Sequence, residues 1–396
     1  MIRPSLLVAT ALAMLAFPAS LALDQQLDGV NYDLRQGPDW DPKKCKTADT
    51  IASELKVLKT ITSKVRTYSL ADCDVSPVLT EAKKLEMTVW LGVWVSDDKK
   101  VFDKEVKTLE SLINKAMIDE NVVGFNVGSE AVYREDISPK QAIEYLTEFR
   151  DVLKKHTLTT PVSITEIGDI LIKYPEIVEA SDIVTANAFP FWEKTDAGKA
   201  APHFHKRIQP LLKIAGKKEV IITETGWPTA GVSPNASEAS PENAARYMND
   251  FYAIAKAEKW KYYYFQAFDS PYKALQSKNE NDVEGNFGIF TADGTMKPAY
   301  TALKFSPLAE SAEEASSSGS SASAVKSKNS TSTAGSAGAG GAGTVKAAGG
   351  SKAGAPAGAS KNTGASPAPS KANSAVHIIS GLGACAAVAA SVVLNL

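Results

Sequence analysis

Two glutamates, Glu130 and Glu224, each follow a short apolar run in this sequence of 396 residues. An acidic side chain is rarely buried unless it is paired or hydrogen-bonded, so a glutamate that ends a buried segment needs an explanation. Either residue could cap a following helix, where negative charge is favourable. Two facing carboxylates could instead cleave a glycosidic bond: one donates a proton to the leaving oxygen while the other attacks the anomeric carbon, and a separation of about 5–5.5 Å retains configuration.

Aromatic residues lie close to the same segments and favour a sugar ligand. Sugar rings have apolar C–H faces that pack well on aromatic rings. Trp94, Trp192 and Trp227 stand beside predicted loops, so we predict that they bind substrate, whereas Trp90 and Phe268 are assigned to the core. Other aromatic residues near these segments are Tyr32, Tyr68, Tyr133, Phe189, Phe191 and Tyr272.

The composition argues against metal and nucleic-acid chemistry. Four His and three Cys are too scattered for a structural zinc site, and nothing near His203 and His205 completes a ligand set. A formal net charge of −2 leaves no basic stripe for nucleic acid. We therefore expect no metal, no cofactor and no nucleic-acid partner, and we expect a monomer.

The elements that must position these residues are predicted to be alternating strands and helices. Short apolar runs without alternation suit strands that are buried on both faces, as in a parallel sheet. Eight such runs lie at 29–32, 65–68, 88–95, 122–127, 162–164, 183–186, 220–222 and 262–268. This pattern predicts one α/β domain at 23–305, a single (β/α)8 TIM barrel whose active site lies at the carboxyl ends of the strands. A doubly wound open sheet is the alternative, but no strand is followed by the Gly-rich phosphate turn that such sheets often carry.

Both ends of the chain carry processing patterns. Residues 1–22 combine Arg3, an apolar run and small residues before a cleavage point after Ala22, which predicts a secretory signal peptide; an N-terminal membrane anchor is the alternative. Residues 306–375 are rich in Ser, Ala and Gly and contain no aromatic residue, so we expect a disordered stalk. Residues 376–396 are an apolar tail that follows small residues, which predicts a C-terminal glycolipid-anchor signal; a tail-anchored helix is the alternative.

These end patterns predict a secreted protein at the cell surface or in the cell wall, with membrane contact only through a C-terminal lipid anchor. Cys385 leaves with the tail, so Cys45 and Cys73 would remain and are expected to pair in an oxidising compartment; two unpaired buried thiols are the alternative. Asn235 and Asn329 begin N-glycosylation motifs, which predicts a glycoprotein.

Residues 27–305 resemble glycoside hydrolase family 17, the β-1,3-glucan-active barrels of fungi, plants and oomycetes. The most specific landmark is Thr-Glu-Thr-Gly-Trp-Pro at 223–228. The other landmarks follow in the expected order at 29–32, 65–68, 90–94, 127–130, 187–191 and 265–273. The resemblance covers nearly the whole predicted domain.

The resemblance implies roles for individual residues. Glu130 falls on the acid/base position of the fourth strand, and Glu224 falls on the nucleophile of the seventh. Residues at positions that bind substrate or line the cleft are Tyr32, Asn187, Asp269 and Lys273, and we add Tyr68 from the second landmark.

Two departures from the family pattern affect this site. Many members place Asn directly before the acid/base, where this chain has Ser129, a substrate-binding residue that can still donate a hydrogen bond over a shorter reach. Gln266 and Ser270 replace carboxylates that members often carry after the eighth strand. This loss removes negative charge near Glu224, which should lower the pKa of Glu224 relative to a carboxylate-rich site.

The sequence therefore predicts a retaining endo-β-1,3-glucanase, a glycoside hydrolase that acts on cell-wall β-1,3-glucan. A β-1,3-glucanosyltransferase is an alternative with the same chemistry, because it passes the glycosyl-enzyme intermediate to a sugar in place of water. A non-catalytic glucan-binding wall protein is the third hypothesis. Its only support is the replacement of two carboxylates, and both central glutamates oppose it.

Overall fold

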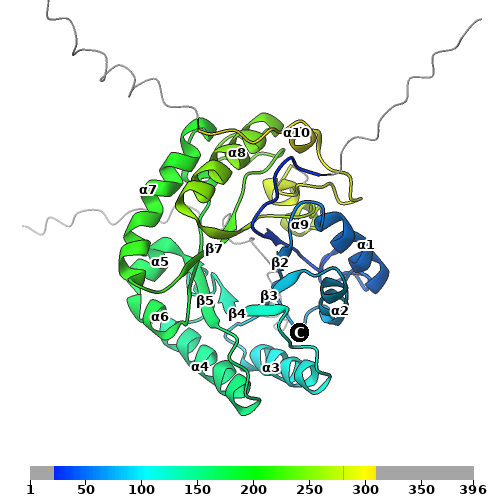
Figure 1. The fold of residues 1–396 in the computed structure, drawn as a ribbon, viewed down its shortest axis with the longest axis vertical. Helices are drawn as coiled ribbons and strands as arrows, with labels where there is room; N and C mark the ends of the chain where they lie inside the picture. Colours follow the sequence, from blue (N-terminus) through cyan, green and yellow to red (C-terminus); the bar gives the residue numbers. More distant parts are fainter. Residues whose placement is uncertain (1–21, 280, 309–396) are drawn as a thin grey trace, which may run out of the picture. The chain divides into compact units, whose positions relative to one another are not determined.

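A computed structural model describes residues 22–279 and 281–308. In this part of the chain, eight parallel strands pair in sequence order, and the last strand closes on the first to form a barrel (Figure 1). The strands are β1 (Val30–Asn31), β2 (Lys64–Arg66), β3 (Thr88–Val93), β4 (Val122–Ser129), β5 (Val162–Ile167), β6 (Val184–Asn187), β7 (Val220–Thr225) and β8 (Lys261–Tyr264). The predicted (β/α)8 barrel is confirmed, and the open-sheet alternative is excluded.

Helices alternate with the strands and surround the barrel (Figure 1). The α-helices are α1 (Ala48–Leu58), α2 (Ser76–Lys84), α3 (Lys99–Asn114), α4 (Pro139–Lys155), α5 (Gly168–Lys173), α6 (Pro175–Ala180), α7 (Ala197–Ala215), α8 (Pro241–Glu258), α9 (Tyr272–Ser277) and α10 (Pro298–Thr301), and the 3-10 helices are η1 (Pro190–Glu193) and η2 (Val283–Asn286). In the described ranges, no helix has the length and apolar character needed to cross a membrane. The predicted leader apart from Ala22, the predicted stalk beyond residue 308 and the predicted anchor signal lie outside the described residues.

Two of the long helices begin at serine caps. The side chains of Ser138 and Ser240 accept hydrogen bonds from the backbone N–H groups of Gln141 and Asn243, at 3.2 and 3.1 Å. A proline follows each cap, where its missing N–H leaves no hydrogen bond unmade. Local sequence therefore sets the starts of α4 and α8, the helices that follow the two strands carrying the glutamates.

The interior of the barrel contains an apolar cluster and a set of buried polar side chains. Trp90, Ile221 and Tyr263 form a separate buried cluster. Gly124 leaves room for it, because a Cβ atom at this position would lie 2.3 Å from the Trp90 ring. Arg66 is buried further along β2. Arg66 is the last residue of β2 and therefore lies at the carboxyl end of its strand, where a (β/α)8 barrel places its active site.

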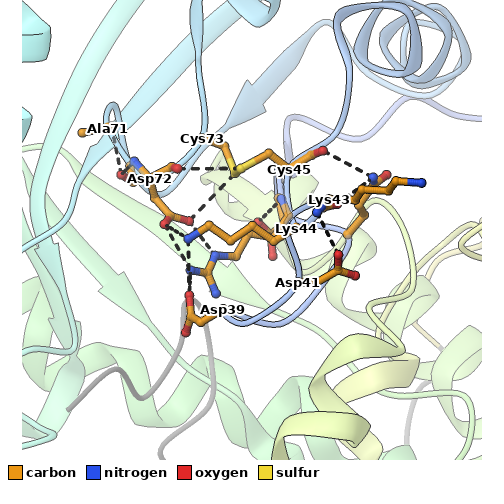
Figure 2. The surroundings of a disulfide bond; sticks show 12 residues. Asp39, Asp41, Lys43, Lys44, Cys45, Ala71, Asp72 and Cys73 are labelled. Atoms are coloured by element: carbon orange, nitrogen blue, oxygen red, sulfur yellow. Dashed lines mark hydrogen bonds and ion pairs between the residues drawn. A yellow bond between two sulfur atoms is a disulfide. The ribbon is translucent and has the colours of Figure 1, made fainter.

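A disulfide joins the loop before α1 to the loop before α2. Cys45 and Cys73 are bonded, with their Cα atoms 5.6 Å apart (Figure 2). Beside the disulfide, the buried Arg35 forms ion pairs with Asp39 and Asp72. The disulfide and the ion pairs together hold these two loops against each other at the edge of the barrel.

Candidate active site

An irregularity at the end of β4 directs the side chain of Glu130. Between Asn126 and Ser129 the pairing with β5 shifts register, so β4 carries one extra residue there. Gly128 has φ +83°, a region that glycine enters without strain, and Glu130 itself has φ +59°. The Glu130 carboxylate is buried and accepts a hydrogen bond from Asn187 Nδ2 at 2.8 Å.

A second irregularity occurs in β7, directly before Glu224. The register between β6 and β7 shifts before the pair Asn187–Glu224, which leaves Thr223 as the extra residue. Thr223 Oγ1 donates a hydrogen bond to Asn187 Oδ1 at 2.8 Å. Asn187 therefore contacts β7 through its carbonyl oxygen and Glu130 through its amide nitrogen, and these two contacts define its orientation.

Arg66 links the two strands that carry the glutamates from inside the barrel. Its Nη1 lies 2.8 Å from Glu224 Oε1, and its Nη2 lies 3.3 Å from Ser129 Oγ. Asn126 and Asn31 accept further hydrogen bonds from the same guanidinium, at 3.1 and 2.9 Å. Arg66 was not among the predicted site residues. An arginine inside an apolar strand was the available signal, because a buried charge needs a partner.

Glu224 combines complete burial with an unsatisfied oxygen. Burial raises its pKa to about 7; Arg66 and Lys273 oppose the rise, and the neighbouring Glu130 adds to it. Among the described residues, Glu224 Oε2 has no hydrogen-bond partner although it is buried. A buried polar atom without a partner is uncommon in folded proteins, which makes this oxygen a candidate for contact with a ligand.

Glu284 adds a third carboxylate to the site. It lies in η2, is buried, and its Oε2 is 3.6 Å from Lys273 Nζ. Burial raises the pKa of Glu284 to about 8, which Lys273 opposes, and Glu130 and Glu224 are close enough to contribute to the rise. Glu284 was not among the predicted site residues, because it ends no strand. It adds a carboxyl group to the site, but with a pKa of about 8 it is largely uncharged at neutral pH, so the loss of negative charge through Gln266 and Ser270 stays a prediction.

A cavity of about 430 Å³ opens beside Glu130. Asn187 and Trp192, both predicted to bind substrate, line it together with Tyr133. Its other lining residues are Ile167, Gly168, Asp169, Ala188, Phe189, Glu193, Arg207 and Ile208. Aromatic rings beside a few polar groups are typical of a small-molecule site. Glu224 is not among the lining residues, because its side chain has no exposed surface.

Of three other residues predicted to bind substrate, Tyr68 and Ser129 lie beside Arg66, and Trp94 lies beside Arg134. The Tyr68 ring lies 4.9 Å from the Arg66 guanidinium, and its buried hydroxyl has no hydrogen-bond partner within the described ranges. Ser129 contacts the same guanidinium. Trp94 is half-buried, with the Arg134 guanidinium 5.1 Å from its ring centre. Tyr68 and Ser129 therefore belong to the cluster around the glutamates, whereas one face of Trp94 is covered by a cation.

Tyr32 and Trp227, both predicted to bind substrate, do not line the cavity beside Glu130. Asn31 points into the barrel, so alternation along the chain turns Tyr32 toward the helices, where its hydroxyl donates to Glu54 of α1. Trp227 is fully buried, and its Nε1 donates to the carbonyl oxygen of Glu238 at 3.0 Å. Neither ring offers an exposed face on which a sugar could stack.

Asp269, which was also predicted to bind substrate, connects two loops and is not among the residues that line this cavity. Its Oδ1 accepts hydrogen bonds from Lys297 Nζ at 2.7 Å and from the Gly288 N–H at 2.9 Å. Lys297 Nζ also donates to the carbonyl oxygen of Asn286 at 3.0 Å. This ion pair therefore anchors the segment that carries Glu284.

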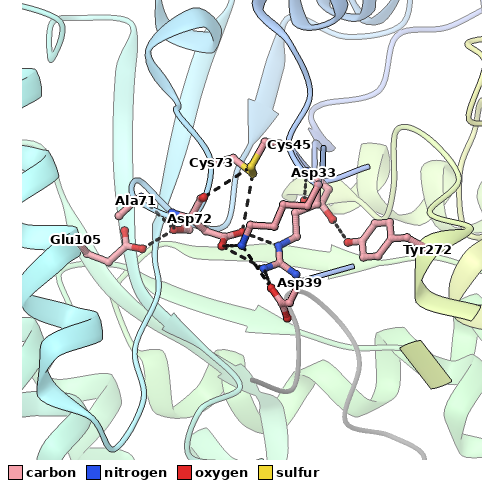
Figure 3. Close-up of polar contacts among 11 residues, drawn as sticks. Asp33, Asp39, Cys45, Ala71, Asp72, Cys73, Glu105 and Tyr272 are labelled. Carbon is pink, nitrogen blue, oxygen red and sulfur yellow. Dashed lines mark hydrogen bonds and ion pairs between the residues drawn. A yellow bond between two sulfur atoms is a disulfide. The ribbon is translucent and has the colours of Figure 1, made fainter. Parts of the chain in front are cut away.

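A chain of polar contacts runs through the loops that border the site (Figure 3). At one end the Tyr272 hydroxyl donates to Asp33, and Glu105 of α3 lies at the other end (Figure 3). Glu105 accepts the N–H of Leu70 at 2.7 Å. Burial raises the pKa of Glu105 to about 7, against hydrogen bonds from Ser69 and Leu70. The loops after β1 and β2 are thus held at several points.

The arrangement suits a reaction that uses two carboxylates with different surroundings. Glu130 opens onto the cavity and is held by a neutral amide, whereas Glu224 is paired with a cation and keeps one free oxygen. Different surroundings allow one carboxyl to act as an acid while the other acts as an anion. Over the described ranges, no group of three or more His, Cys, Asp or Glu is arranged to hold a metal ion.

A family model described as the BtgE/BtgC glycoside hydrolase domain matches residues 29–288. The matched range contains every strand of the barrel and both glutamates. It also includes Glu284 of η2. The match therefore covers the whole site described above.

Fungal proteins show the same similarity. The chain is 30% identical over 269 residues to the glucan 1,3-beta-glucosidase of Saccharomyces cerevisiae, which covers 64% of this chain and 85% of that protein. It is 30% identical over 291 residues to the probable glucan endo-1,3-beta-glucosidase btgC of Aspergillus terreus, covering 68% of this chain but only 43% of that protein. Among solved structures, the glycoside hydrolase family 17 beta-1,3-glucanosyltransferase of Rhizomucor miehei is 30% identical, with a TM-score of 0.60 over 71% of this chain and 98% of its own. An active-site mutant of that enzyme, in complex with laminaritriose, gives a TM-score of 0.61.

Proposed function

Because this chain belongs to the BtgE/BtgC glycoside hydrolase family, we propose that it is a retaining endo-β-1,3-glucanase. The names of the fungal relatives support the substrate, and the laminaritriose bound to the Rhizomucor miehei enzyme supports the same linkage. The observation that carries the mechanism is the linked pair of glutamates. Arg66 contacts Glu224 and the residue before Glu130, while Asn187 contacts Glu130 and the residue before Glu224.

In the first step, Glu224 is the nucleophile. Its free Oε2 forms a bond to the anomeric carbon while the bond from that carbon to the leaving oxygen breaks, and Glu130 gives its proton to that oxygen. In the second step, Glu130 takes a proton from a water molecule, which attacks the anomeric carbon and releases Glu224. Burial disfavours the anionic form of Glu224, and Arg66 opposes this effect, because a positive charge beside a carboxyl favours its anionic form.

The cavity beside Glu130 is the proposed site for a sugar ring next to the cleaved bond. Trp192 supplies an aromatic face, Asn187 supplies an amide, and Tyr133 supplies a second ring along the same wall. Tyr68 and Lys273 lie on the Glu224 side of the site, where the Tyr68 hydroxyl and Glu284 Oε2 are buried without hydrogen-bond partners in the described part of the chain. These atoms are suitable partners for sugar hydroxyls.

The test is the Glu224→Gln variant assayed on laminarin. We expect its turnover to fall by several orders of magnitude, because an amide cannot form the glycosyl-enzyme bond, while thermal unfolding stays cooperative. Undiminished cleavage by this variant would show that Glu224 is not the nucleophile. For the wild type, NMR should detect the β-anomer first among the products of laminari-oligosaccharides of defined length. Products longer than the supplied oligosaccharide would instead identify a transferase, the activity in the name of the Rhizomucor miehei relative.

We also propose that the protein acts outside the cell, at the surface or in the wall. The Cys45–Cys73 disulfide supports this location, because disulfides persist mainly in oxidising compartments. The leader and tail patterns support secretion with a C-terminal lipid anchor. Release of the protein from intact cells by a phosphatidylinositol-specific phospholipase would support the anchor, and full retention on the cells would contradict it.

A further inference from the structure

Glu166 is a buried carboxyl that takes no part in the proposed chemistry. It lies near the end of β5 and has no exposed surface. Ser163 and Thr165 turn their side chains into the barrel, where they bond to Asn126 and Thr185, so alternation directs Glu166 to the helix side. It is absent from the lining of the cavity. A buried carboxyl in this layer needs hydrogen-bond partners.

The partners of Glu166 are two backbone N–H groups in the turn after Glu130. Glu166 Oε1 accepts the N–H of Val132 at 2.7 Å, and Oε2 accepts the N–H of Tyr133 at 3.2 Å. Burial raises the pKa of Glu166 to about 8, and these two hydrogen bonds oppose the rise. The two contacts therefore offset part of the cost of placing this carboxyl beneath the turn.

The turn after β4 is one that needs such support. Glu130 has φ +59°, a backbone conformation that is strained for a residue other than glycine and that persists only where the surrounding structure holds it. Its own N–H donates to the carbonyl oxygen of Thr165 at 2.8 Å. The end of β5 thus holds the turn at two places. Thr165 binds the N–H of Glu130, and Glu166 binds the N–H groups of Val132 and Tyr133.

We propose that Glu166 is a positioning residue for the acid/base: its carboxyl fixes the turn at 130–133, so that Glu130 delivers its proton to the leaving oxygen and Tyr133 stays on the cavity wall. This inference rests on the proposed function. A carboxyl suits the role because each of its oxygens can accept a hydrogen bond, also when one of them carries a proton, whereas a glutamine would direct its NH2 group at one of the two N–H groups.

The Glu166→Gln variant tests the proposal with two substrates. One is a laminari-oligosaccharide, whose leaving alcohol needs a proton; the other is a dinitrophenyl β-laminarioside, whose leaving group departs without one. Because general acid catalysis contributes roughly 10²–10⁴-fold, we expect kcat/KM on the oligosaccharide to fall about tenfold or more relative to kcat/KM on the aryl substrate. Glu166→Asp keeps a carboxyl on a shorter side chain, so its kcat/KM on the oligosaccharide should fall less, relative to its kcat/KM on the aryl substrate.

Glu105→Gln is the matched control. Glu105 is also buried and also accepts a backbone N–H, but it holds the loop after β2 and not the turn after Glu130 (Figure 3). Its substitution should affect both substrates equally. If Glu166→Gln also lowers both equally, or lowers neither, the proposal is overturned. If the wild type cleaves neither substrate, the proposed function fails first, and this inference fails with it.

Discussion

Arg66 sets the charge balance between Glu130 and Glu224, the two glutamates of the proposed mechanism. It is buried and donates to Glu224 and to the residue before Glu130. Breaking a buried ion pair by removing one partner leaves an uncompensated charge, so the group that remains tends to become neutral. At the scale of single residues, Arg66 therefore determines how far the pH must rise before Glu224 can act as a nucleophile.

Arg66→Gln should move the acidic limb of the kcat/KM profile to higher pH. An adjacent guanidinium lowers the pKa of a carboxyl by about 1–3 units, so its loss should raise the pKa of Glu224 further above about 7. The measurement is kcat/KM on laminari-oligosaccharides from pH 4 to 9. Arg66→Lys keeps a positive charge and should move the limb less. A limb that stays in place in Arg66→Gln would mean that Glu224 does not control it.

At the scale of elements, the ends of two strands depart from regular pairing. The extra residue in β4 lies between Asn126 and Ser129, and the extra residue in β7 is Thr223. Bulges are common beside active sites, because they redirect side chains that regular alternation would place elsewhere. In this barrel, both bulges directly precede the glutamate that the proposed reaction uses.

Gly128→Ala should disturb the β4 bulge and with it the aim of Glu130. The added Cβ would lie 2.9 Å from Val95 Cγ2, and the left-handed backbone would cost alanine about 1–2 kcal/mol. We expect lower stability in chemical denaturation and a loss of turnover in the folded enzyme. Gly294→Ala has a similar positive φ with no atom near the added Cβ, so it should lose stability without losing turnover. Equal turnover in both variants would contradict a role for the bulge.

At the scale of the whole molecule, the barrel buries an unusual set of glutamates. Burial raises the pKa of Glu105 and Glu224 to about 7, and that of Glu166 and Glu284 to about 8. The native state therefore binds protons that the unfolded chain releases near pH 4.5. The stability that these protons provide is fully present below that pH, and it is lost as the pH rises through 7 to 8.

The free energy of unfolding should accordingly fall between pH 5 and pH 8, with a melting temperature several degrees lower at pH 8. Asp72, whose pKa is lowered by Arg35 and Lys44 against the effect of burial, changes stability only at more acidic pH. Thermal unfolding followed by circular dichroism across this range provides the measurement. Glu105→Gln should make the slope shallower. A melting temperature that rises with pH would rule out this account.

The sequence by itself determined the barrel, and it singled out Glu130 and Glu224 as the candidate catalytic pair. Eight apolar runs of strand length are local patterns, and a glutamate at the end of a buried strand is conspicuous in any (β/α)8 arrangement. Asn187 was predicted only through the resemblance to a family. The cap residues of α4 and α8 follow from the residues next to them in the sequence. These features depend on short stretches of chain, which is why they could be predicted.

Only the tertiary structure decided which side chains face the site. Tyr32 turns outward because the inward position on its strand belongs to Asn31, and Trp227 is buried under the loop that follows β7. Arg66 and Glu284 reach the glutamates from segments far apart in the sequence. The direction of a side chain depends on bulges, strand register and packing between distant segments. These features cannot be predicted from a local pattern of residues.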